Sequence, residues 1–101
     1  MHAGGGGALS EDELAALRRR FCARTAGQVR ELRASIARWD VQAPEIERVA
    51  HTIAGTGAML GFREVAAAAA AVDDRYAAGQ LPSREALEAL LTAMEALDPA
   101  D

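Results

Sequence analysis

Apolar side chains recur every three or four residues through most of the chain, which is the spacing of amphipathic α-helices. The longest such stretch follows Ser10 and continues for about seven turns to Trp39. Ser10 and Glu13 have the spacing of a capping box, so the first helix is predicted to begin there. Its inward positions are Leu14, Leu17, Phe21, Thr25, Gln28 or Val29, Leu32, Ile36 and Trp39.

Three shorter helices are predicted after the first. Pro44 suits the first turn of a second helix, and Gly61 is placed to end it. A third helix follows from Phe62 to Gly79, and a fourth lies between Ser83 and Pro99. The inward positions of these three helices are Ile46, Val49, Ala50, Ile53, Gly57 and Leu60, then Phe62, Val65, Ala69, Val72 and Tyr76, then Leu87, Leu90, Leu91, Met94 and Leu97.

The fold class follows from these elements. Strictly alternating apolar and polar runs are missing and β-branched residues are few, so nothing in the sequence predicts a strand. Four helices joined by short connections favour an all-α, antiparallel up-down four-helix bundle with a long first helix. Residues 1–9 are predicted to be a flexible tail, and residues 10–101 a single domain.

Composition narrows the function classes. All eleven basic residues are arginine, so chemistry that needs a lysine nucleophile or a Walker A lysine is excluded. A net charge of -4 gives no support for nucleic-acid binding. Cys22 is the single cysteine, which excludes an internal disulfide framework and a cysteine-rich zinc site. The longest uncharged stretch, Val49–Phe62, is too short to span a bilayer, so a cytoplasmic location is expected.

The segment around His51 departs from the helical pattern. It places two glycines and two threonines inside the predicted second helix, although glycine costs about 1 kcal/mol there relative to alanine. His51 is one step off the inward stripe, so it is expected at the edge of the buried face and at least partly open. Ala54, Gly55 and Ala58 share its face and are all small, so a partner surface could approach the imidazole closely. A structural alternative is that these small residues seat another helix.

This segment resembles the signature of the histidine-phosphotransfer (HPt) domain family. His51 is followed by Gly55 four positions on and by Gly61 ten positions on, as in that signature. The resemblance extends to the long first helix, the histidine on the second helix, and the acidic Asp73 on the third. It covers about residues 10–97.

The resemblance implies a four-helix bundle that carries a phosphoryl group on His51 between aspartates of receiver domains. Its partners would be the receivers of response regulators and of hybrid histidine kinases, docking over Arg48, Ala54, Gly55 and Ala58. Such a protein is a phosphotransfer intermediate rather than a stand-alone catalyst. It is expected to be a monomer with no cofactor or metal of its own, because the receiver supplies the Mg²⁺. Imidazole suits this role, since its ordinary pKa of about 6.5 leaves a neutral nucleophile near pH 7.

One position departs from the family pattern. The family usually has lysine three residues after the histidine, and Ala54 stands there in this chain. Arg48, one turn before His51, or Arg63, just after Gly61, could supply the missing positive charge. The departure leaves open weaker phosphohistidine stability, a changed partner preference, or loss of transfer.

Two further interpretations remain beside a phosphorelay module. Ala54 is compatible with an HPt-like adaptor that docks receivers or kinases without taking phosphate. An unrelated helical bundle is the other alternative, and it predicts a buried His51. A metal enzyme has little support, because only Glu47 stands at metal-ligand helical spacing from His51.

Several other residues are given structural interpretations. The cluster Arg18–Arg20 is read as a solvated helix face, because three consecutive residues point in different directions. Asp73 is read as an acid at the boundary of the core and Asp74 as solvent-facing, since adjacent helical residues diverge by about 100°. Tyr76 and Trp39 are expected to pack rather than to bind a ligand.

Overall fold

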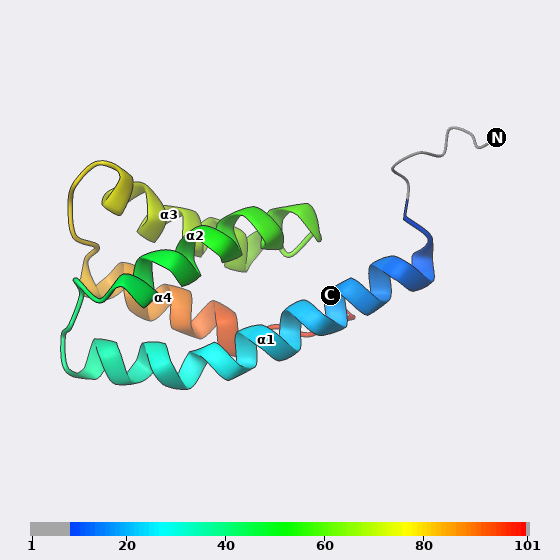
Figure 1. Ribbon diagram of the computed structural model, residues 1–101, viewed down its shortest axis with the longest axis horizontal. Coiled ribbons are helices and arrows are strands. Elements are labelled where there is room, and N and C mark those ends of the chain that lie inside the picture. Colours follow the sequence, from blue (N-terminus) through cyan, green and yellow to red (C-terminus); the bar gives the residue numbers. More distant parts are fainter. Residues whose placement is uncertain (1–8, 101) are drawn as a thin grey trace.

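A computed structural model describes residues 9–100, which form four α-helices and no strand. The helices are α1 (Glu11–Ala37), α2 (Pro44–Met59), α3 (Arg63–Ala77) and α4 (Arg84–Glu95). Figure 1 shows them packed side by side as an up-down bundle, with the first half of α1 extending beyond the other three. The predicted fold class is confirmed. Of the predicted tail, residues 1–8 lie outside the described residues.

The predicted signals for helix ends account for the observed boundaries. Ser10 and Glu13 form the expected capping box, and the hydrogen bonds to Ser10 lower the pKa of the Glu13 carboxyl. Ser83 caps α4 by accepting a hydrogen bond from the backbone N–H of Ala86. Gly61 and Gly79 follow α2 and α3 with φ of +88° and +74°, a conformation that favours glycine.

The core lies between the helices and contains most of the predicted inward positions. Two predicted members are wrong: Leu14 is 37% exposed and Trp39 is 40% exposed. Leu14 belongs to the part of α1 that extends past the bundle (Figure 1), where its side chain is only partly covered. Trp39 lies two residues beyond the end of α1, with φ of +55°, and the guanidinium of Arg84 stacks 4.3 Å from its ring.

The interpretation of the arginine cluster Arg18–Arg20 as a solvated face is wrong for Arg18. Its guanidinium donates hydrogen bonds to the carbonyl oxygens of Leu60 and Pro99, and it lies 4.2 Å from the ring centroid of Phe62. The Leu60 carbonyl belongs to the end of α2, where helical carbonyls lack partners within the helix. Arg18 therefore ties α1 to the α2–α3 turn and to the C-terminal segment.

Candidate functional site

His51 lies on the outer surface of α2, and its side chain is 78% exposed. This exposure contradicts the buried histidine that the unrelated-bundle interpretation predicts. The local sequence explains the exposure, because Val49, Ala50 and Ile53 fill the inward positions of α2 and leave the intervening His51 outside. An imidazole in this position is open to a macromolecular partner.

The imidazole has one polar partner in the described part of the chain. Nδ1 of His51 lies 3.1 Å from Oδ2 of Asp73 on α3, whose side chain is 23% exposed. A carboxylate can only accept a hydrogen bond, so Nδ1 carries the proton in this pair. The neutral imidazole then has its lone pair on Nε2. The contact holds the ring in one tautomer and one orientation.

The sequence alone does not predict this contact. Asp73 was predicted at the boundary of the core, where it lies, but with no partner. The two residues are 22 positions apart, and the antiparallel packing of α2 on α3 brings them together. A weak signal was present, because His51 lies ten positions before Gly61 and Asp73 lies twelve positions after it, which places the two residues at similar distances from the turn along antiparallel helices.

Tyr76 holds this part of α3 in place. Its hydroxyl donates a hydrogen bond of 2.6 Å to the carbonyl oxygen of Val41, in the connection before α2. Burial, with a smaller contribution from the carboxylate of Glu47, raises the pKa of Tyr76, so the hydroxyl stays protonated and remains a donor. The contact links the end of α3 that carries Asp73 to the start of the helix that carries His51.

The small residues beside His51 form an open strip. A Cβ added at Gly55 would meet no heavy atom within 4 Å, and Ala58 is exposed one turn further on. Ala54 differs, because it is half-buried and packs against the core. Of the predicted docking residues, Arg48, Gly55 and Ala58 are therefore exposed beside His51, and Ala54 is only partly accessible.

The two arginines considered as replacements for the family's lysine lie in different places. Arg48 lines an open hollow together with His51, Asp73, Glu47 and Pro44. Arg63 is at the start of α3 and lines a separate hollow. It precedes Asp73 by ten residues, which corresponds to about 15 Å along a helix. Only Arg48 shares the surroundings of the imidazole.

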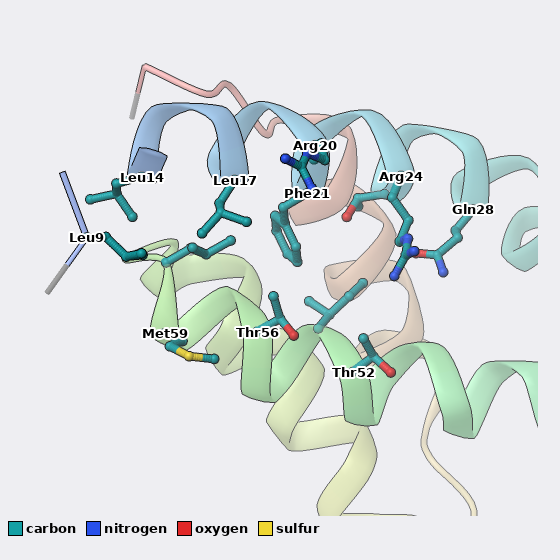
Figure 2. Close-up of a pocket in the computed structure, with 13 residues that line it drawn as sticks. Leu9, Leu14, Leu17, Arg20, Phe21, Arg24, Gln28, Thr52, Thr56 and Met59 are labelled. Carbon is teal, nitrogen blue, oxygen red and sulfur yellow. The ribbon is translucent and has the colours of Figure 1, made fainter. Parts of the chain in front are cut away.

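An apolar groove of about 540 Å³ runs between the first half of α1 and α2 (Figure 2). Thr52 and Thr56 lie on its α2 wall, so the groove is adjacent to the strip that carries His51. Met59 stands at its edge and is 79% exposed. The groove was not predicted from the sequence, because the apolar side chains of α1 that line it were assigned to the core. The α1 residues that line the groove are Leu14, Leu17, Arg20, Phe21, Arg24, Thr25 and Gln28.

Comparison with known protein families shows which family this chain belongs to. The sequence pattern of the Hpt domain matches residues 16–100. The chain belongs to the Hpt domain family. Neither the curated proteins nor the solved structures that were compared include a match to this chain.

Two further findings concern metal binding and membrane spanning by this Hpt domain. In the part of the chain that the structure describes, no group of three or more histidine, cysteine, aspartate or glutamate side chains is arranged to hold a metal ion. None of the described helices is long and apolar enough to cross a membrane.

Proposed function

We propose that this Hpt domain carries a phosphoryl group between receiver-domain aspartates of a two-component phosphorelay, with His51 as the phosphoacceptor. The observation that supports this most is the exposed imidazole whose Nδ1 is held by Asp73. A nucleophile that must meet an aspartate on another protein has to be exposed and correctly oriented. His51 meets both conditions.

The transfer step follows from the tautomer. The lone pair on Nε2 of His51 attacks the phosphorus of the receiver's acyl phosphate, and a bond forms between Nε2 and phosphorus. The bond between phosphorus and the acyl oxygen breaks, and its electron pair returns to the receiver's aspartate as a carboxylate. The proton remains on Nδ1, so the phosphorylated ring becomes cationic. The carboxylate of Asp73 stabilises that positive charge, and transfer to the next aspartate reverses the same steps.

The strip and the groove provide a surface for the receiver. Gly55 and Ala58 leave space directly beside the imidazole, so the rim of a receiver's active site can reach Nε2. The apolar groove lies next to this strip, with Arg20 and Arg24 among its lining residues. An exposed apolar patch of modest size suits a transient complex rather than a permanent one. The receiver is expected to bring the Mg²⁺ that supports the reaction.

The test is a phosphotransfer profile against a panel of phosphorylated receiver domains. Wild type should take up acid-labile, base-stable label from at least one receiver, and His51→Gln should take up none. His2→Gln is the matched control, because it removes the only other histidine of the chain and should transfer like wild type. Equal labelling of wild type and His51→Gln would exclude His51 as the acceptor.

An adaptor that docks receivers without taking phosphate is the second candidate function, and Ala54 in place of the family's usual lysine favours it. The same panel separates the two. The adaptor predicts receivers that bind the wild-type protein, measured by calorimetry, while no receiver transfers label to it.

A further inference from the structure

The hollow beside His51 carries an unequal set of charges. Its lining contains the carboxylates of Asp73 and Glu47 and a single permanent cation, the guanidinium of Arg48. A phosphoryl group attached to His51 would bring a further charge of about -2 into this hollow. Repulsion from two carboxylates would oppose that charge, so the residue that offsets it has a direct effect on the reaction.

The position of Arg48 on α2 separates it from those carboxylates. At about 100° per residue, Arg48 lies about 60° from His51 towards the side of Thr52 and the groove. Glu47 lies about 40° from His51 on the other side, which faces α3 and Asp73. Helical side chains lean towards the N-terminus, so the imidazole lies over the turn that contains Arg48. Arg48 and His51 line the same open hollow, so the guanidinium lies in the surroundings of the imidazole.

Arg48 is also available for a ligand. Across residues 9–100, no hydrogen bond or ion pair engages its guanidinium. Arg18 and Arg33, in contrast, are held by backbone carbonyls and by Glu95. A guanidinium presents two parallel N–H donors that match two oxygens of a phosphoryl group. An arginine without an intramolecular partner keeps these donors for an incoming anion.

We propose that Arg48 is the phosphoryl-binding residue of this site, donating to the oxygens of the phosphoryl group on Nε2 of His51 and offsetting the charge of the two carboxylates. This inference rests on the proposed function and adds to it the cation that the site uses. Arg63, in a separate hollow, has no part in it.

Potassium phosphoramidate provides a test that does not depend on receiver docking. In this reaction the phosphorus–nitrogen bond of the donor breaks, ammonia leaves with the electron pair, and the Nε2–phosphorus bond forms. Arg48→Ala should lower the rate of phosphohistidine formation about tenfold, the effect of losing one charge-assisted hydrogen bond. Arg48→Lys should keep part of the rate, because it retains the charge but loses the paired donors. Arg63→Ala is the matched control and should react like wild type.

Two further measurements separate phosphoryl binding from a merely structural role. Raising the ionic strength should narrow the difference in rate between wild type and Arg48→Ala, because salt screens both the attraction of Arg48 in the wild type and the repulsion of the two carboxylates that remain in the variant. Ala54→Lys should restore the rate when added to Arg48→Ala, since position 54 flanks His51 at about 60° on the opposite side.

The outcomes are distinct. Equal rates for wild type and Arg48→Ala, or an equal loss in Arg63→Ala, would overturn the assignment of Arg48. Wild type that reacts with phosphoramidate but accepts label from no receiver would overturn the proposed relay and leave Arg48 supported by its own variants. No labelling of wild type by either donor would overturn both.

Discussion

Gly55 and Gly57 are two residues apart on the same helix, yet their surroundings differ completely. A Cβ at Gly57 would lie 3.4 Å from the ring of Phe21 and 3.5 Å from side-chain atoms of Val65 and Ala66. A Cβ at Gly55 would meet nothing within 4 Å. Gly57 allows α2 to approach α1 and α3 closely. Gly55 gives the fold no packing contact and costs helix stability, which agrees with the proposed role of this position in receiver docking.

The largest expected effect on stability is at Gly57. Gly57→Leu should lower the free energy of unfolding by about 2 kcal/mol, because the added side chain has no space between Phe21 and α3. Urea denaturation followed by circular dichroism measures this change. Gly55→Leu is the matched control and should not be destabilised. An equal loss of stability in both variants would contradict the difference between a packed Gly57 and an open Gly55.

The next largest effect is expected on the rate of phosphoryl transfer when Gly55 is replaced. Gly55→Leu should reduce the rate of phosphoryl uptake from a receiver at least about tenfold, equivalent to 1.4 kcal/mol, because the leucine stands beside the imidazole. Its thermal stability should be no lower than that of wild type. Unchanged uptake would mean that the receiver does not approach over the strip.

A smaller effect is expected from Gly55→Ala. Alanine is the better helix former and meets no neighbour, so the free energy of unfolding should rise by about 0.5 to 1 kcal/mol. Denaturant midpoints of the variant and of wild type give the measurement. A decrease in stability would show that Gly55 has an internal structural role after all.

The smallest effect on the fold is expected at Met59, which is 79% exposed at the edge of the groove. Met59→Ala should change the free energy of unfolding by no more than about 0.5 kcal/mol. Receiver affinity, measured by calorimetry, should nevertheless fall about threefold, because the side chain adds apolar surface beside the strip. Unaltered receiver affinity would mean that the edge of the groove at Met59 is not part of the docking surface.

Much of the fold could be predicted from local pattern. The helix boundaries could be predicted because caps and turns depend on residues close in sequence. They were marked by the Ser10–Glu13 capping box and by Pro44, Gly61 and Gly79. The errors at Leu14 and Trp39 have a different origin. A periodic pattern identifies the apolar face of a helix but not how far its neighbours extend along it. The first half of α1 keeps the pattern and has less to pack against, and that half forms the groove.

The features of the candidate site likewise divide into those set by the sequence and those set by the tertiary structure. The sequence by itself determined the helical class and pointed to His51 as the proposed acceptor with small residues beside it, since these depend on residue type and helical spacing. Only the tertiary structure decided that Asp73 holds Nδ1, that Arg48 rather than Arg63 shares the hollow with the imidazole, and that Arg18 is bound by distant carbonyls. Each of these depends on the register of one helix against another. Register is set by the packing of the whole core, whereas spacing along one helix is already present in the sequence.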